Sequence, residues 1–195
     1  MPSSATSVDR GTYHHGDLRA ALLATATQLL EEGEPFSLRA VARGAGVSPT
    51  APYRHFSDRE ALESAVAVDG FRRLRAVLAE PGAPTSTHDL GDLAVRYVEF
   101  ALDHRAVFRL MFGQECDDSD DDRVVAAGQL RELLGGALAG VFPGVDPQAQ
   151  RDLAIGSWAL VHGLAFLHLD GKLPAHPRAE VSARVRRALA AVLAV

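Results

Sequence analysis

The sequence predicts an all-α protein in two parts, a small N-terminal three-helix unit and a larger C-terminal helical domain. Apolar residues recur at the spacing of one helix face through most of the 195 residues, and no stretch alternates apolar and polar residues as a half-buried strand would. Serine caps, glycine stops and proline breaks separate these segments. Apolar residues make up 47% and charged residues 23% of the chain, an ordinary balance for a soluble globular protein.

The first predicted helix covers residues 17–32. It follows a polar arm, residues 1–12, which lacks the long apolar core of a signal peptide. Its expected buried face consists of Leu18, Leu22, Ala26 and Leu29. Gly33 comes next, and a glycine there ends a helix by taking a left-handed conformation.

Residues 37–60 predict two short helices separated by a tight turn, followed by the start of another helix. Ser37 is the expected N-cap of the first one. Its buried face follows the helical spacing in Leu38, Val41, Ala42 and Ala45. The turn is Ala45-Gly46-Val47, in which Gly46 takes the positive φ of a sharp reversal.

The second short helix is expected to begin at Ser48, with Pro49 at its first position, and to end at Phe56. Pro52 lies four residues after the cap, where it removes an intrahelical hydrogen bond and crowds the Ser48 carbonyl. We therefore expect the start of this helix to be distorted. The run from Ser57 to Glu60 then has the spacing of a capping box that opens the following helix.

The rest of the chain predicts a series of longer helices. They cover residues 57–79, 90–102, 123–142, 148–169 and 178–194, with a short apolar segment at 107–112. The break from Glu80 to Pro84 is the predicted linker. The clearest amphipathic stripe is Leu90, Leu93, Ala94, Tyr97, Val98, Ala101 and Leu102.

The segment from Leu153 to Leu169 contains only Ser157, His162 and His168 as polar residues, and a helix that is apolar on every side is buried all round. A membrane span is the competing interpretation, but 17 residues with two histidines fit it poorly. We expect one side to pack on its own domain and the other, with the last helix, on a second copy of the chain. The candidate dimer residues are Gly156, Ala159, Gly163, Val181, Val185 and Leu189.

Residues 13–62 resemble the N-terminal domain of the tetracycline-repressor (TetR) family of transcriptional regulators. The matching features are the amphipathic first helix, the small residue Ala42, the turn from Ala45 to Ser48, the Tyr-x-His-Phe of Tyr53 to Phe56, and the basic Arg59. The resemblance implies that residues 13–60 bind double-stranded DNA, and a two-fold dimer would bind a pseudo-palindromic operator. The candidate DNA contacts are His14, His15, Ser37, Arg39, Ser48, Thr50, Ala51, Tyr53, Arg54, His55 and Arg59. Many members of the family carry an aliphatic residue immediately before this tyrosine, where this chain has Pro52. This departure bears on the base contacts carried over by position and less on the assignment of the domain.

Trp158 and His162-Gly163, with the upstream segment FRLMFG, resemble the C-terminal regulatory domain of the TetR branch named for its Trp-His-Gly signature. The resemblance implies that residues 61–195 dimerise and hold a small-molecule cavity. Apolar walls with a few polar groups suit an apolar or aromatic effector. The candidate ligand contacts are Tyr97, Phe108, Met111, Phe112, Trp158, His162 and Phe166.

The candidate residues also have structural interpretations. Tyr53 could pack beneath the turn, and Thr50 could be plain helix surface. Trp158 and His162 could be core residues, the histidine satisfied by a hydrogen bond. The acidic run from Asp117 to Asp122 lacks the glycine and closing glutamate of an EF-hand loop, so we expect a solvated loop and no metal site.

Composition narrows the function further. The net charge is −5, but residues 1–75 carry nine arginines and nine acidic residues, so the excess of acid belongs to the second part. The single cysteine, Cys116, cannot form an intrachain disulfide, which fits a cytoplasmic protein. The sequence shows no nucleotide, cofactor or hydrolase motif.

The leading hypothesis is a ligand-responsive, dimeric DNA-binding regulator, a repressor released from its operator by a small molecule, with no enzymatic activity and no cofactor. The alternative is an all-α small-molecule carrier or enzyme whose helix-turn-helix no longer binds DNA because of Pro52. Salt-dependent binding to duplex DNA favours the first; turnover or tight binding of a metabolite without any effect on DNA favours the second.

Overall fold

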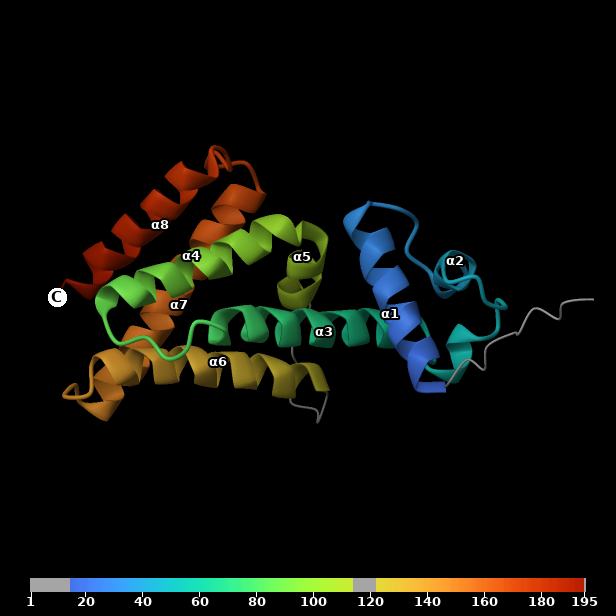
Figure 1. Ribbon diagram of the computed structural model, residues 1–195, viewed down its shortest axis with the longest axis horizontal. Helices are drawn as coiled ribbons and strands as arrows, with labels where there is room; N and C mark the ends of the chain where they lie inside the picture. Colours follow the sequence, from blue (N-terminus) through green and yellow to red (C-terminus); the bar gives the residue numbers. More distant parts are fainter. Residues whose placement is uncertain (1–14, 114–121, 195) are drawn as a thin grey trace, which may run out of the picture. The chain divides into compact units, whose positions relative to one another are not determined.

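The computed structural model describes residues 15–113 and 122–194, and within these ranges it contains helices, turns and loops but no strand (Figure 1). The all-α prediction is therefore confirmed. The chain divides into two compact units between Leu62 and Glu63, two residues beyond the predicted boundary. The polar arm, Cys116 and most of the acidic run lie outside the described residues.

The N-terminal unit contains α1 (His15–Glu31), α2 (Leu38–Gly44), the 3₁₀-helix η1 (Pro52–Arg54) and the first residues of α3 (Arg59–Ala79). Its core consists of Leu22, Ala26, Val41, Ala42, Phe56 and Leu62, each at most 3% exposed. Gly33 and Gly46 have φ values of +71° and +68°, so the predicted helix stop and turn are confirmed. Ser37 caps α2 by accepting a hydrogen bond from the backbone N–H of Ala40 at 3.1 Å.

The segment after the turn differs from the predicted α-helix. Residues 48–51 form turns and only Pro52–Arg54 is helical, as 3₁₀. The reason is proline chemistry: Pro52 has no N–H to donate to the Ser48 carbonyl, and the N–H of Ala51 bonds that carbonyl instead, at 3.0 Å. His55 bonds the Pro52 carbonyl at 2.9 Å, again across three residues, which is the 3₁₀ pattern. The Ser48 hydroxyl does not cap a helix but contacts the Thr50 hydroxyl at 3.3 Å.

The cap of α3 is also shifted by one residue from the prediction. Asp58, not Ser57, accepts the hydrogen bond from the Ala61 N–H, at 2.8 Å, while the Ser57 hydroxyl donates to the other carboxylate oxygen of Asp58 at 2.9 Å. These two bonds, the Ala61 bond foremost, lower the pKa of the Asp58 carboxyl. A carboxylate at a helix N-terminus is a stronger acceptor than a hydroxyl and also meets the positive end of the helix dipole.

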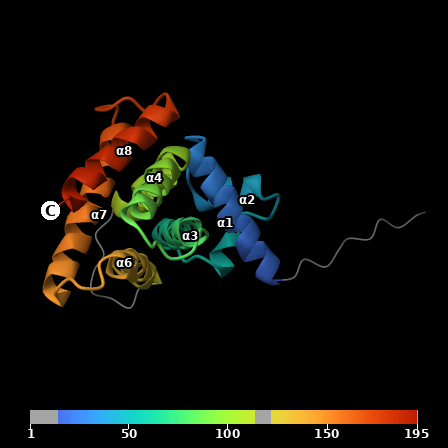
Figure 2. The same ribbon diagram turned by 60° about the vertical axis from the view of Figure 1, so that its left-hand side comes forward.

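The C-terminal unit consists of the rest of α3 together with α4 (Thr87–Asp103), α5 (Arg105–Gly113), α6 (Asp122–Val141), α7 (Pro147–Leu169) and α8 (Arg178–Leu193). Both α7 and α8 pack on α4, and α6 packs on α7 (Figures 1 and 2). All seven residues of the predicted amphipathic stripe are buried on α4. By length and composition α6 and α7 could each cross a membrane, but here they pack against each other.

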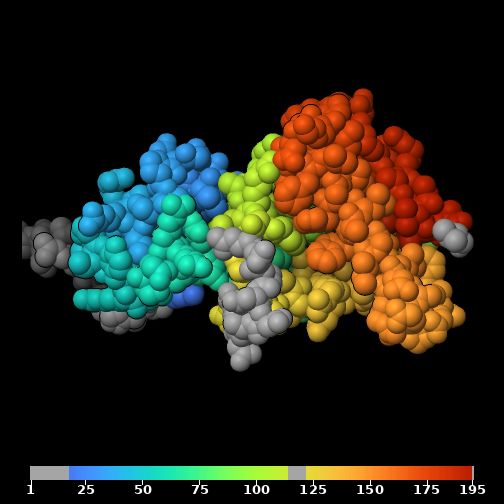
Figure 3. All heavy atoms as spheres, turned by 180° about the vertical axis from the view of Figure 1, so that it is seen from behind, coloured from blue at the N-terminus to red at the C-terminus, as the bar shows by residue number. Residues whose placement is uncertain are grey.

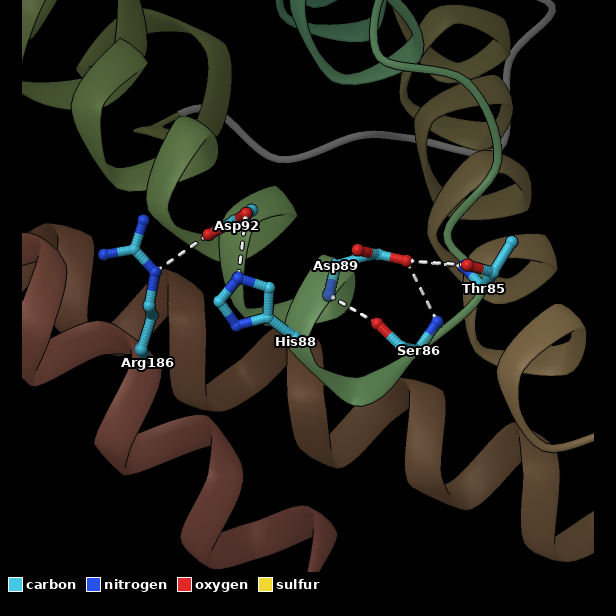
Figure 4. Close-up of polar contacts among 6 residues, drawn as sticks. All are labelled: Thr85, Ser86, His88, Asp89, Asp92 and Arg186. Atoms are coloured by element: carbon cyan, nitrogen blue, oxygen red, sulfur yellow. Dashed lines mark hydrogen bonds and ion pairs between the residues drawn. The ribbon is translucent and has the colours of Figure 1, made fainter.

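The start of α4 is held by a reciprocal capping box (Figure 4). The Ser86 hydroxyl accepts from the Asp89 N–H at 3.2 Å, and the Asp89 carboxylate accepts from the backbone N–H groups of Ser86 and Thr85 at 3.0 and 2.9 Å. These bonds, the Thr85 backbone bond foremost, lower the pKa of Asp89. One turn later, Asp92 accepts from the Arg186 guanidinium at 2.8 Å and so joins α4 to α8.

Helix α7 is not buried all round. Ile155 and Leu167 are 62% and 43% exposed, and Gly156 and Ala159 are also exposed. The opposite face is buried and consists of Ser157, Val161, Leu164, Ala165 and His168. Figure 3 shows α7, in orange, at the surface beside α6, in yellow. One side of α7 therefore packs on its own domain, and the other side is uncovered in the single chain.

The predicted companion surface on α8 is corrected by the structure. Val181, Val185 and Leu189 are at most 3% exposed, so they are core residues and not an interface. They form the apolar stripe with which α8 packs on α4 and α7. The stripe of an amphipathic helix is satisfied here by its own domain, which leaves none of these three side chains for a second copy.

Candidate functional site

The first candidate site is the exposed surface of residues 48–55 in the N-terminal unit. Thr50 and Arg54 are exposed, and Tyr53 is 51% exposed. Pro52 and Phe56 are buried and anchor the segment, and the Arg19 guanidinium lies 5.4 Å from the centre of the Phe56 ring. Pro52, which prevents an α-helix here, is thus buried in a turn whose polar side chains are exposed.

Within this segment the hydrogen bonds join residues three apart. Only Pro52–Arg54 is a 3₁₀-helix, so Tyr53 lies on it and Thr50 lies in the turn before it. Arg39, on α2, is exposed, whereas Ala51 and His55 are half-buried.

The other candidate DNA contacts differ in their surroundings. The Ser37 hydroxyl caps α2, whereas the hydroxyls of Ser48 and Thr50, both exposed residues, lie 3.3 Å apart. Arg59 is exposed, with its guanidinium 5.8 Å from the centre of the Phe36 ring. His14 lies outside the described residues, and so does the side chain of His15, which begins α1.

The second candidate site is an aromatic cluster in the C-terminal unit. It gathers the aromatic members of the predicted ligand set: Tyr97 from α4, Phe108 and Phe112 from α5, and Trp158, His162 and Phe166 from α7. The His162 ring is central, with its centroid 4.6 Å from that of Phe112 and 4.9 Å from that of Phe166.

A hydrogen-bonded chain runs through this cluster. The indole N–H of Trp158 donates to the Tyr97 hydroxyl oxygen at 3.3 Å, and that hydroxyl lies 2.9 Å from Nδ1 of His162. Because tryptophan can only donate, the Tyr97 oxygen accepts from the indole, and the Tyr97 O–H can then donate to Nδ1 of a neutral His162 that carries its proton on Nε2. Burial supports this state, since it raises the pKa of Tyr97 and lowers the pKa of His162.

The predicted pocket is not inside the cluster but beside it. Phe108 is fully buried and Met111, the remaining predicted ligand residue, is 1% exposed, so both side chains belong to the core of this unit. A small cavity of about 50 Å³, partly open to solvent, adjoins Tyr97 and Trp158. The other residues that line it are Leu90, Leu93, Ala94, Leu134, Leu138, Ala154, Ser157, Val161 and Leu189.

A second hollow of about 810 Å³, which includes open solvent, lies against Phe71, Met111, Phe112 and Trp158 and is otherwise lined by residues of α6. Trp158 therefore adjoins both hollows. His162 and Phe166 line neither of them and belong to the packed cluster, where His162 reaches the cavity wall through its bond to Tyr97.

Sequence reasoning missed most of the cavity wall. Leu90, Leu93 and Ala94 are recognisable as a helix face, but nothing local indicates that α6 and α7 leave space opposite them. The one local signal is Ser157, a small polar residue on an apolar helix face. Among the residues described, no cluster of histidine, cysteine, aspartate or glutamate has the arrangement of a metal site.

The chain matches two family models. Residues 90–192, more than half of the chain, match the tetracyclin repressor-like C-terminal domain, and residues 22–66 match the model of bacterial regulatory proteins of the tetR family.

Among solved structures, a protein of unknown function from Rhodococcus sp. RHA1 is 36% identical, with a TM-score of 0.75, over 91% of this chain and 95% of that one. A tetR-family transcriptional regulator from Streptomyces coelicolor has the same fold, with a TM-score of 0.75 at 22% identity, over 93% of this chain and 82% of that one.

An uncharacterized HTH-type transcriptional regulator of Haemophilus influenzae is 30% identical over 124 residues, which span 60% of this chain and 59% of that relative. The match thus covers less than two thirds of the relative's length. The family models, in contrast, cover the N-terminal unit from within α1 and nearly all of α4 to α8. The chain belongs to the tetR family of bacterial transcriptional regulators.

Proposed function

We propose that this protein is a cytoplasmic, dimeric, sequence-specific DNA-binding regulator that represses its target until a small molecule releases it from its operator. The observation that carries the proposal is the exposure of Thr50, Tyr53 and Arg54 in a segment anchored by buried Pro52 and Phe56, directly after a capped helix and a glycine turn. A rigid polar surface of this kind, in a helix-turn-helix unit, is what base edges and phosphates require.

The charge of the N-terminal part supports DNA contact through local rather than overall attraction. Residues 1–75 are balanced in charge, but Arg39 and Arg54 are exposed, so each can neutralise a phosphate. Thr50 and Tyr53 are exposed in the same segment as Arg54 and have hydroxyls for a base edge and a phosphate. The proposed division is that Arg54 and Tyr53 position the protein while Thr50 contributes to sequence preference.

The uncovered face of α7 supports a dimer. Ile155 and Leu167 are large apolar side chains with high exposure, and Gly156 and Ala159 between them leave room for another helix to approach closely. A second copy that covers this face makes an isologous interface, in which the same residues of both copies are in contact. Residues 48–55 of the two copies would then contact half-sites whose centres lie about 34–36 Å apart, or a multiple of this distance. The half-buried Gly163 extends the same strip.

The cavity beside Trp158 supports a ligand switch. It lies in the C-terminal unit, and α3 begins in the N-terminal unit and ends in the C-terminal one. A ligand that binds one arrangement of the dimer better than the other changes operator affinity, and operator changes ligand affinity by the same factor. A coupling of about 1–3 kcal/mol corresponds to a 5- to 150-fold change.

Selection of duplexes from a random library by the purified protein tests the DNA part. We expect enrichment of a pseudo-palindrome whose binding weakens with salt. Arg54→Ala should reduce the slope of log affinity against log salt by about 0.9 for each phosphate that is no longer neutralised, and by twice that in a dimer. Thr50→Ala should instead alter the order in which the protein prefers different DNA sequences. Arg151→Ala, an exposed arginine at the start of α7, is the matched control and should change neither.

The alternative is a carrier or enzyme that does not bind DNA, and one observation favours it. The turn at Pro52 presents fewer residues to a groove than the expected α-helix. If no duplex is enriched and the protein instead binds or converts a metabolite tightly, the alternative replaces the proposal.

A further inference from the structure

Ser157 is a buried polar side chain whose hydroxyl has no partner among the described residues. It lies on the inner face of α7, is 7% exposed, and its Oγ makes no hydrogen bond there. A buried hydroxyl without a hydrogen bond destabilises the fold, because it has lost its bonds to water and has gained none in return. Packing alone does not require it, because alanine would fill nearly the same space.

The same serine lines the cavity beside Trp158. Its hydroxyl makes no hydrogen bond with the described residues, unlike the other polar side-chain groups that line the cavity. The cavity has two other polar side chains, Tyr97 and Trp158, but their hydroxyl and indole N–H are bonded to each other and to His162. The remaining lining residues are all alanine, leucine or valine, and no charged side chain is among them. The part of a guest that lies inside the cavity therefore meets mainly apolar side chains and one unpaired hydroxyl.

We propose that the cavity selects an uncharged, mainly hydrocarbon or aromatic molecule with a single neutral hydrogen-bonding group, which pairs with the Ser157 hydroxyl. The inference rests on the proposed ligand cavity and adds the chemical class of its ligand. Oγ is closed to solvent in this structure, so pairing requires rotation about the Cα–Cβ bond of Ser157, a change that is local to one side chain. An ionised group inside the cavity is disfavoured because its charge would lie against apolar side chains without a counter-charge.

Three probes with one ring system separate the parts of this inference: naphthalene, 2-naphthol and 2-naphthoate, each measured by equilibrium dialysis against the full-length protein. At neutral pH the first has no polar group, the second a neutral hydroxyl and the third a negative charge. We expect 2-naphthol to bind at least about 10-fold more tightly than 2-naphthoate.

Ser157→Ala tests the hydroxyl directly. We expect it to weaken 2-naphthol binding by about 3- to 10-fold and to change naphthalene binding by less than about 2-fold. The matched control is Ser182→Ala, because the hydroxyl of this α8 serine donates to Glu99 at 2.9 Å and lies outside the cavity. The control should leave all three affinities unchanged.

Two results with probes that bind would overturn the inference, and so would the absence of any probe binding. One is an equal loss of 2-naphthol and naphthalene binding in Ser157→Ala, which would show that the serine only shapes the wall. The other is 2-naphthoate binding to the wild type as tightly as 2-naphthol, a comparison that needs no variant. If the wild type binds none of the probes yet binds its selected duplex, the inference fails while the DNA-binding proposal stands. If it binds the probes as expected but binds no duplex, the DNA-binding proposal fails while the inference about the cavity stands.

Discussion

Replacing Tyr97 by phenylalanine removes one oxygen atom from the centre of the aromatic cluster. The phenyl ring keeps its edge-to-face packing on Phe108, where the ring centroids are 5.6 Å apart. The change therefore removes the hydrogen-bonded chain and little else. Trp158 loses the acceptor of its indole N–H, and His162 loses the donor to Nδ1.

The expected loss of stability follows from these two bonds. Each hydrogen bond contributes a net of about 0.5–1.5 kcal/mol, or about 1–3 kcal/mol for the pair. Two effects reduce the expected loss of stability. The Tyr97 side chain is 1% exposed, so the variant is spared the desolvation of a buried hydroxyl. Trp158 and His162 are only half-buried, so water can replace part of the lost hydrogen bonding. We expect the free energy of unfolding to fall by about 1–2 kcal/mol.

Urea unfolding at one fixed protein concentration measures the change, with fluorescence of Trp158, the only tryptophan, as the signal. Tyr53→Phe is the matched control because this tyrosine is 51% exposed, and its effect should stay within about 0.5 kcal/mol. A second readout is an NMR titration of His162. Its pKa should rise in Tyr97→Phe, because the donor that favours the neutral ring is gone.

The reasoning would be refuted by a Tyr97→Phe protein as stable as the wild type in which the pKa of His162 has not moved. That pair of results would mean that the hydroxyl contributes no net hydrogen bonding and that His162 is neutral for another reason. A loss of stability with an unchanged pKa of His162 would contradict the direction of the Tyr97–His162 bond alone.

Three further changes have defined outcomes. Gly70→Ala places a Cβ 2.7 Å from Sδ of the buried Met111. We expect it to lower the free energy of unfolding, because overpacking costs about 1–3 kcal/mol and the gain in helix propensity is about 1 kcal/mol. Gly135→Ala is the control: no atom lies within 4 Å of the added Cβ, so this variant should be stabilised in the same urea assay. Burial lowers the pKa of His168 below its ordinary 6.5, so the unfolded chain takes up a proton more readily than the folded chain. The stability of the fold should therefore fall as the pH drops below about 6.5, and it should fall less steeply in His168→Gln. Thermal unfolding between about pH 7.5 and 5 measures both. Ser37→Ala removes the cap of α2 and should lower the free energy of unfolding by about 1 kcal/mol, and a value near zero would show that water replaces the hydroxyl.

Local sequence determined the helices and most of their ends. The predicted ranges 148–169 and 178–194 agree with Pro147–Leu169 and Arg178–Leu193, because a cap or a proline acts within one turn and apolar spacing reports a helix face directly. The error at residues 48–56 has a local cause as well. Pro49 suits a first helical turn, but Pro52 removes the next bond, and the 3₁₀ turn is the conformation that remains.

The candidate sites divide in the same way. The cluster around Trp158 and His162 was predictable because aromatic residues at helical spacing converge on a common core. The hollow beside it was not, since an empty space depends on how α4, α6 and α7 fail to fill the volume between them. None of these helix sequences contains that information alone.

The sequence by itself thus determined the all-α fold, the helix-turn-helix unit and the faces that each helix must bury. Only the tertiary structure decided what covers those faces. The stripe of Val181, Val185 and Leu189 reads equally well as core or as dimer interface, and it is α4 and α7 that bury it, while part of α7 remains uncovered. Periodicity records that a face is apolar, but the partner of that face is set by the packing of segments far apart in the chain.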